Sequence, residues 1–263
     1  WSSPQTVAGF ARSTANPTLL EIARGLRGRG GFRCLDIGCG AARNAVALAR
    51  DGWQVVGTDV SWPMLHAAVD RMRAEAPGGR TLFAAAPMDR LSVTDGWADL
   101  VIAHGIWNLA RSASEFRAAV REAARAARPG ACLFLFTFSR TTLPESVSPL
   151  PGEPFVFTQF SGEPQCFLTQ AQVLAEMAAA GFVPDKALPL HELNRPAGPI
   201  RTTSGPVIGT MATSIFFTRS AGGGEQARMP VRAPRSMARS TMQRCGGSSS
   251  RRRIPTQYGS IRC

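Results

Sequence analysis

An acidic residue and two alternating glycines stand together early in the chain, as Asp36, Gly38 and Gly40. Glycine lets the backbone turn tightly and lets a ligand approach the main chain. A helix that begins at such a turn offers unpaired N–H groups to that ligand. The carboxylate of Asp36 would accept hydrogen bonds from an ammonium or hydroxyl group and would repel a phosphate. The segment therefore predicts a cofactor site, and Asp36 favours a cofactor with hydroxyl or ammonium groups.

A second carboxylate, Asp59, follows Gly40 by 19 residues, at the predicted end of the next strand. In that place a carboxylate binds both hydroxyls of a ribose through charge-assisted hydrogen bonds. This feature fits dinucleotides and other adenosyl cofactors equally. A dinucleotide turn needs a third glycine so that the pyrophosphate can rest on the helix N-terminus. The chain has Arg43 at that position, so a dinucleotide is the weaker of the two interpretations.

The elements that must position these residues alternate between strand and helix. Short apolar runs bounded by Gly, Pro or Asp predict buried strands, and a 3.6-residue periodicity predicts the helices between them. Asn16, Ser61 and Thr169 are predicted N-caps. Buried strands that alternate with helices predict an α/β fold, in which helices cover both faces of a parallel sheet. The predicted strands are 32–37, 53–58, 80–85, 99–103, 131–138, 182–190 and 206–219, and the predicted helices are 17–29, 42–50, 61–75, 113–128 and 170–180.

The last part of the chain differs in composition from the rest. Residues 220–263 hold nine Arg and one acid, a net charge of +8, while the whole chain has a formal net charge of +12. They lack apolar periodicity, so they cannot bury enough apolar surface to fold. We predict a folded domain over 1–219 and a disordered tail over 220–263. Two other interpretations of the tail stay open: translation past the natural stop, and a basic segment that binds nucleic acid.

Composition excludes several classes of site and partner. The six cysteines form no C-x-x-C pair and the chain has three histidines, so no metal site is predicted. Free cysteines in apolar runs are typical of a reducing compartment, so we predict a cytoplasmic protein. No apolar run approaches the roughly 18 residues of a membrane span, and no membrane partner is expected.

Taken together, the motifs resemble those of the class I S-adenosylmethionine-dependent methyltransferases. In that family the first strand ends on an acid followed by alternating glycines, a pattern that Asp36, Gly38 and Gly40 match. Ala42 stands where a third glycine is usual. The resemblance covers residues 16–138 well. It implies S-adenosylmethionine as the cofactor and a doubly wound, Rossmann-like, mostly parallel sheet of seven strands, with helices on both faces and an antiparallel last strand.

The resemblance also implies a set of cofactor contacts. The glycine turn would contact the methionine part of the cofactor, Asp59 would bind the ribose, and Met64 would pack near the adenine, although core packing explains Met64 equally well. Pro87 occupies the position of an acid that binds the adenine amino group in many relatives. That hydrogen bond would then be absent or supplied by Asp89, and Met88 would cover the ring. The implied cofactor-binding residues are Asp36, Gly38, Cys39, Gly40, Asp59, Val60, Met64, Met88 and His104.

His104 is the candidate catalytic residue. It ends a run that begins at Asp99 and resembles the family's fourth-strand motif, whose end opens beside the transferred methyl group. Histidine can serve as a general base near neutral pH. Methyl transfer to a thiolate or another soft anion needs no base, so the alternative is that His104 positions the cofactor or the substrate. We favour the positioning role, and we predict a structural role for Asp99.

Further residues are candidates for binding the substrate. The segment 140–166 is rich in Pro and Gly and is predicted to be a long loop, a lid or a substrate cover. Four phenylalanines would line an apolar pocket or, equally, anchor the loop to the core: Phe155, Phe157, Phe160 and Phe167. Four basic side chains would bind an anionic substrate, although solvation at the surface explains each of them better: Arg12, Arg140, His191 and Arg195.

We therefore predict an enzyme that transfers a methyl group from S-adenosylmethionine to a small-molecule acceptor by direct displacement. The glycine turn followed by Arg43 and Asn44 also resembles the tellurite-resistance-type branch of small-molecule methyltransferases. Three alternatives stay open: a nicotinamide-dependent oxidoreductase, an RNA methyltransferase that uses the basic tail, and a non-catalytic protein that binds the cofactor. Nucleic acid is not expected as a partner, because the body lacks an added RNA-binding module. The oligomeric state is not predicted.

Overall fold

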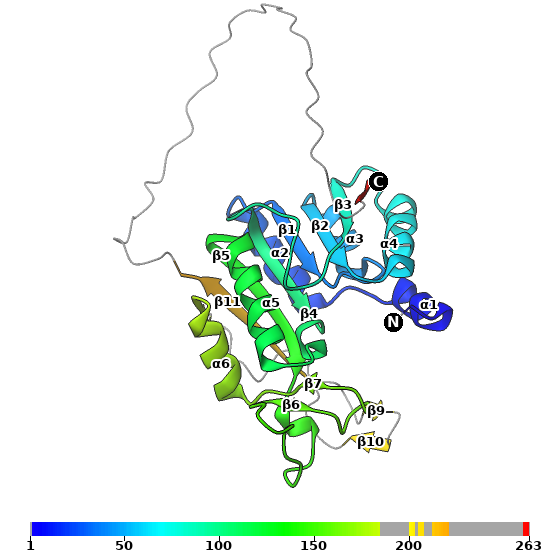
Figure 1. Cartoon of the computed structure of the whole chain (residues 1–263). Helices are drawn as coiled ribbons and strands as arrows, with labels where there is room; N and C mark the ends of the chain where they lie inside the picture. Colours follow the sequence, from blue (N-terminus) through cyan, green and yellow to red (C-terminus); the bar gives the residue numbers. More distant parts are fainter. Residues whose placement is uncertain (1, 185–199, 203–204, 208–211, 221–259, 263) are drawn as a thin grey trace, which may run out of the picture.

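A sheet of eight strands forms the centre of the fold, in the order β12-β3-β2-β1-β4-β5-β11-β8 (Figure 1). The computed structural model describes residues 2–184, 200–202, 205–207, 212–220 and 260–262. The chain leaves β1 toward β2 and β3, and then returns to place β4 and β5 on the other side of β1. The strands are β1 (Arg33–Ile37), β2 (Gln54–Asp59), β3 (Thr81–Ala85), β4 (Ala98–His104), β5 (Ala127–Phe138), β8 (Phe182–Pro184), β11 (Ala212–Arg219) and β12 (Ser260–Arg262).

Five neighbouring strands of this sheet run parallel. Leu35 of β1 lies opposite Val56 of β2 and Val101 of β4, and the pairs β2–β3 and β4–β5 are parallel as well. β11 runs antiparallel between β5 and β8, with Phe217 opposite Leu133. The predicted doubly wound, mostly parallel, Rossmann-like sheet with an antiparallel last strand of the domain is therefore confirmed. β12, antiparallel to β3 at the edge, was not predicted.

The described residues form six α-helices around the sheet. The side chains of Asn16, Ser61 and Thr169 each accept a hydrogen bond from the backbone N–H three residues on, so the three predicted N-caps are confirmed. Each such cap contributes about 1 kcal/mol. The first helix was not predicted, and none of its residues is fully buried. The helices are α1 (Pro4–Arg12), α2 (Pro17–Gly28), α3 (Arg43–Arg50), α4 (Trp62–Glu75), α5 (Ala113–Ala126) and α6 (Gln170–Ala179).

Different helices cover the two faces of the sheet. Successive residues of a strand point to opposite faces. Cys34 of β1 therefore packs in a cluster with α2, α3 and α4, while Leu35 packs in a second cluster with α5 and α6. Figure 1 shows α5 on the near face of the sheet, with α2 behind β1. Each fully buried Leu or Phe side chain in these clusters contributes about 1.5–3 kcal/mol.

The segment 140–166 has more structure than the predicted loop. It contains a short 3₁₀ helix, η2 (Arg140–Thr142), and a two-stranded sheet, β6 (Val156–Phe157) and β7 (Gln165–Cys166). The Arg140 guanidinium donates hydrogen bonds to the carbonyls of Leu143, Pro144, Glu145 and Val147, so it closes this segment instead of facing a substrate. A further sheet pairs β9 (Ile200–Thr202) with β10 (Gly205–Val207).

The four phenylalanines of this region anchor it. Phe155 is buried in the main core, where its ring packs edge-on against Phe116 at 5.3 Å between centroids. Phe157, Phe160 and Phe167 form a separate apolar cluster with Phe138. Of the two interpretations given from the sequence, the anchoring role is the one that these contacts support.

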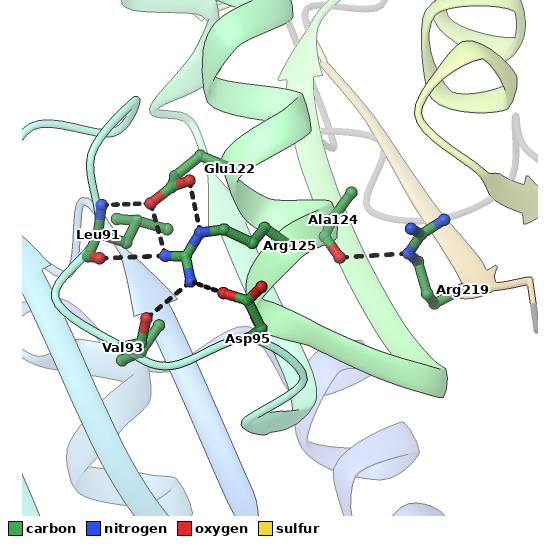
Figure 2. A network of polar contacts seen from close by, with 7 residues as sticks. All are labelled: Leu91, Val93, Asp95, Glu122, Ala124, Arg125 and Arg219. Atoms are coloured by element: carbon green, nitrogen blue, oxygen red, sulfur yellow. Dashed lines mark hydrogen bonds and ion pairs between the residues drawn. The ribbon is translucent and has the colours of Figure 1, made fainter.

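The connection between β3 and β4 contains no helix and is held by a charged network from α5 (Figure 2). Arg125 donates hydrogen bonds to the carbonyls of Leu91 and Val93 and to the carboxylates of Asp95 and Glu122. Glu122 also accepts a hydrogen bond from the Leu91 N–H at 2.8 Å. These bonds raise the pKa of Arg125 and lower that of Glu122. The network therefore fixes the segment that leads into β4.

Several predictions lie partly or wholly outside the described residues. β8 ends at residue 184 of the strand predicted over 182–190, and β11 begins at residue 212 of the strand predicted over 206–219. His191, Arg195 and most of the predicted tail over 220–263 lie outside the described ranges. No helix in the described part of the chain has the length and apolar character needed to span a bilayer.

Candidate functional site

A cavity of about 240 Å³ opens at the carboxyl ends of β1, β2, β4 and β5. Its position is the point where the chain reverses direction across the sheet, which is where open α/β sheets bind their ligands. Six of the nine predicted cofactor-binding residues line it: Gly38, Gly40, Asp59, Val60, Met64 and His104. The structure thus brings together most of the residues that the sequence singled out.

The glycine turn forms the floor of this cavity. Gly38 and Gly40 have φ angles of 67° and 51°. A Cβ atom on Gly38 would lie 2.7 Å from the Ile106 side chain, and one on Gly40 would lie 3.2 Å from the Phe10 ring. Among the described residues, Ala42 is the one non-glycine residue with a positive φ angle, 61°. It is also the N-cap of α3, and its side chain makes no capping hydrogen bond. The first N–H groups of α3 are therefore open to a ligand.

Asp59 fastens the end of β2 to this turn. One carboxylate oxygen accepts a hydrogen bond from the Gly40 N–H at 2.9 Å, and the other accepts one from the Ser61 N–H at 2.8 Å. Burial raises the pKa of Asp59, and the backbone hydrogen bonds oppose that rise. Each oxygen keeps lone-pair capacity toward the cavity. Asp59 therefore supports the turn, a role that the sequence did not predict, in addition to the predicted ribose contact.

Asp36 lies buried behind the turn and does not line the cavity. Its Oδ2 atom has no hydrogen-bond partner among the described residues. Burial raises the pKa of Asp36 from 3.8 to about 7, the charge of Arg43 lowers it, and Asp59 raises it. An unpaired buried oxygen of this kind is unfavourable unless a ligand donates to it.

Arg43, the first residue of α3, reaches across the crevice to His104 at the end of β4. Its Nη2 contacts Nδ1 of the imidazole and lies 3.4 Å from Nε2. The His104 ring stacks on Phe136 at 4.4 Å and on Phe134 at 5.7 Å between centroids. Burial, followed by the charge of Arg43, lowers the pKa of His104 to about 3. The imidazole is therefore neutral and weakly basic, which favours positioning over general-base catalysis.

The other predicted site residues lie elsewhere. The thiol of Cys39 is buried beneath the turn, where burial raises its pKa and where Sγ would lie 2.9 Å from a Cβ atom on Gly57. Met88 packs against the main core cluster and is not among the residues that line the cavity. Arg12 is exposed at the end of α1. Asp99 binds the backbone N–H groups of Phe32 and Arg33, in agreement with its predicted structural role.

Much of the cavity wall was not predicted. Phe10 comes from the unpredicted helix α1, and the aromatic residues of β5 were predicted only as part of a strand. Arg43 served only as an argument against a dinucleotide cofactor. Its place directly after the glycine turn was a sufficient signal to predict it as a ligand-binding residue. The unpredicted lining residues are Phe10, Arg43, Gly105, Ile106, Leu109, Phe136 and Phe138.

Comparisons with known proteins identify a methyltransferase domain in the chain. Residues 34–130 match the family model described as "Methyltransferase domain". The chain is 28% identical over 176 residues to the ubiquinone biosynthesis O-methyltransferase of Azorhizobium caulinodans, covering 66% of this chain and 68% of that protein. It is 29% identical over 166 residues to the demethylmenaquinone methyltransferase of Mycolicibacterium vanbaalenii, covering 57% and 68%.

A solved structure supports the fold. The crystal structure of an S-adenosylmethionine-dependent methyltransferase from Methanosarcina mazei superposes with a TM-score of 0.56 at 20% identity, covering 72% of this chain and 92% of that one. The matched domain begins in β1 and ends within β5, so it contains the glycine turn, Asp59 and His104. The matched domain therefore contains most of the cavity lining, while Phe10, Phe136 and Phe138 lie outside it.

Proposed function

We propose that this chain, a class I S-adenosylmethionine-dependent methyltransferase, transfers the methyl group to a small, ring-bearing acceptor by direct displacement. The matched domain and the methyltransferase relatives establish the class and its cofactor. The observation that carries the acceptor proposal is the two-sided lining of the cavity. Glycines, Asp59 and Met64 lie on the β1–β2 side, and an apolar wall lies on the β4–β5 side.

The residues on the β1–β2 side fit the cofactor. The glycine turn and the uncapped start of α3 leave backbone N–H groups and space for the methionine part, and Asp59 offers carboxylate oxygens to the ribose. The unpaired Oδ2 of Asp36 behind the turn is an acceptor for an ammonium-bearing group. When bound, S-adenosylmethionine supplies a methyl group that its sulfonium already activates.

The residues on the β4–β5 side fit a small apolar acceptor. Ile106, Leu109, Phe136 and Phe138 form a wall that excludes water and aligns the acceptor for in-line attack. The two relatives named above are methyltransferases of ubiquinone and menaquinone biosynthesis by their descriptions, which is consistent with ring-bearing acceptors. Alignment in a dry site is the main contribution of this chain to the reaction.

The resemblance to the tellurite-resistance-type branch rests on Arg43 and Asn44. Asn44 is buried, and its side-chain oxygen accepts a hydrogen bond from the Asn16 N–H at 3.3 Å. This bond joins the start of α2 to α3, so Asn44 has a structural role. Arg43 alone lines the cavity, and it is compatible with organic as well as inorganic anions. We therefore propose the small-molecule class without that branch.

Calorimetric titration with S-adenosylhomocysteine tests the cofactor half of this proposal. We expect the wild type to bind it and Asp59→Ala to bind about ten- to one-hundred-fold more weakly, since hydrogen bonds to a charged group contribute about 1.5–3 kcal/mol. Asp59→Asn, which keeps an oxygen for the turn, separates ligand contact from turn support. Asp51→Ala, at the exposed end of α3, is the matched control and should bind as the wild type does.

A transfer assay with methyl-labelled cofactor tests the acceptor half. We expect label on ring-bearing phenols or quinols and none on RNA. Tight binding of a nicotinamide dinucleotide without binding of S-adenosylhomocysteine would overturn the cofactor assignment. Label on RNA alone would overturn the small-molecule acceptor.

A further inference from the structure

One cation reaches into the cavity, from the start of α3. Arg43 is the only cationic side chain among the described residues that line the cavity, and it is half-buried. It forms no ion pair with a carboxylate in the described part of the chain. Its contact is with the neutral imidazole of His104. A half-buried guanidinium beside apolar walls binds an anion more favourably than it remains unpaired.

Neither of the two nearby carboxylates, Asp36 and Asp59, forms an ion pair with this cation. Asp36 is buried behind the turn, outside the cavity lining, and its burial favours the neutral form. Asp59 accepts hydrogen bonds from the backbone N–H groups of Gly40 and Ser61. The cation therefore faces a cavity whose other lining side chains, apart from Asp59 and His104, are apolar.

The position of the guanidinium shows which half of the cavity it serves. It contacts His104, whose ring stacks on Phe136 of β5. This is the β4–β5 side, with Leu109 and Phe138, and not the β2 side, where Asp59 and Met64 lie. Arg43 crosses the crevice from the cofactor-binding turn to the wall of the acceptor space.

We propose that Arg43, positioned by its contact with the His104 ring, binds an oxyanion of the acceptor, so that this enzyme takes phenolate- or enolate-type acceptors. This inference rests on the methyltransferase function proposed above. The weakly basic His104 does not remove a proton from the acceptor, so the acceptor must react as an anion. The guanidinium stabilises that anion and lowers the pH at which it forms.

The resulting reaction balances without a general base. The acceptor anion supplies the electron pair of the new bond to the methyl carbon, from its oxygen or from the carbon conjugated with that oxygen. The pair of the broken carbon–sulfur bond stays on sulfur. The negative charge of the acceptor and the positive charge of the sulfonium cancel, and Arg43 then holds the neutral product less tightly than the anion.

A spectroscopic binding experiment tests this inference without turnover. The probe is 4-nitrophenol, whose phenolate absorbs visible light, titrated with pH in the presence of wild-type enzyme and S-adenosylhomocysteine. We expect the bound phenol to titrate about one pKa unit lower than the free phenol, the size of shift that a neighbouring guanidinium gives. Arg43→Met should abolish the shift, and Arg43→Lys should retain part of it. Arg50→Met, at the other end of α3 and exposed, should leave the shift unchanged.

A second measurement separates the acceptor from the cofactor as the partner of Arg43. S-adenosylhomocysteine carries a carboxylate, and 5′-methylthioadenosine lacks it. If Arg43 serves the acceptor, Arg43→Met binds both with wild-type affinity. A loss of about tenfold or more for S-adenosylhomocysteine, with unchanged binding of 5′-methylthioadenosine, assigns Arg43 to the cofactor and overturns the inference.

The remaining outcomes are equally decisive. The inference is overturned if the phenol does not bind, if it binds without a pKa shift, or if Arg43→Met gives the same pKa shift as the wild type. In each of these cases the proposed function still stands, provided that the wild type binds S-adenosylhomocysteine. Failure of the wild type to bind S-adenosylhomocysteine removes the proposed function and the inference with it. Tryptophan fluorescence and near-ultraviolet circular dichroism of each variant verify that the chain is folded.

Discussion

Replacing Asp36 with Asn should make the ligand-free protein more stable at alkaline pH. Burial raises the pKa of Asp36 from 3.8 to about 7 in the folded chain, while the unfolded chain leaves this carboxyl in water. A raised folded pKa means that the stability contributed by the protonated form is fully present below pH 3.8. It is lost as pH rises through 7. Asn has nearly the same shape and does not ionise, so Asp36→Asn removes this loss.

The size of the effect follows from the shift. Each pKa unit corresponds to about 1.36 kcal/mol, so the full shift amounts to at most about 4 kcal/mol between acid and alkaline pH. Between pH 5 and pH 8 the expected part is about 2–3 kcal/mol. The free energy of unfolding of Asp36→Asn, minus that of the wild type, should therefore increase by that amount over this interval.

Urea denaturation at pH 5 and pH 8 measures this difference, because groups that titrate alike in both proteins cancel. Asp51→Asn, at the exposed end of α3, is the matched control, because it makes the same replacement outside the core. If the difference in free energy of unfolding between Asp36→Asn and the wild type is equal at the two pH values, Asp36 has the same pKa in the folded and unfolded chain. The electrostatic account of the turn would then be wrong.

Two further substitutions test the scaffold of the site by urea unfolding. Arg125→Met should lower the free energy of unfolding by about 1–3 kcal/mol, because it leaves Glu122 and two loop carbonyls without their donor. The control is Arg121→Met, an exposed position on the same helix, which should change the free energy of unfolding by less than about 0.5 kcal/mol. Equal losses in the two variants would refute the network of Figure 2. Ala42→Gly should change the free energy of unfolding by no more than about 1 kcal/mol. Glycine relieves about 1–2 kcal/mol of strain in the left-handed conformation, and this gain offsets the loss of a buried methyl group and the greater entropy of the unfolded chain. Ala45→Gly inside the same helix should lose about 1.5–2 kcal/mol, and a similar loss for Ala42→Gly would show that Ala42 is unstrained.

The parts of the fold that could be predicted are those with a local cause. Strand and helix periods, Gly and Pro boundaries and side-chain caps act over a few residues, so the elements from α2 to β5 were found within about four residues at each end. The glycine turn and Asp59 were found for the same reason, since each follows a strand whose carboxyl end is fixed by the parallel sheet. Local chemistry thus located the cofactor side of the cavity.

The parts that were missed depend on contacts distant in the chain. α1 buries no residue fully, and Phe10 becomes a cavity residue only because α1 packs on α4. β11 lies between β5 and the edge strand β8, so the order of these strands in the sheet differs from their order in the chain, and no local sequence pattern predicts it. The contact between Arg43 and His104 joins residues that are 61 positions apart. The acceptor side is built from such contacts, which is why the sequence left it open.

The charges of the site are coupled, and this coupling offers a final test of the geometry. Arg43 lowers the pKa of Asp36, while burial and Asp59 raise it. Removing the guanidinium leaves only the two raising influences, so in Arg43→Met the carboxyl should stay protonated to a higher pH than in the wild type. The stability loss assigned to Asp36 should then extend upward beyond pH 7 and should vanish in the double variant with Asp36→Asn. A pH dependence of unfolding that is identical in Arg43→Met and the wild type would mean that the guanidinium does not act on Asp36, and would require Arg43 to lie outside the crevice.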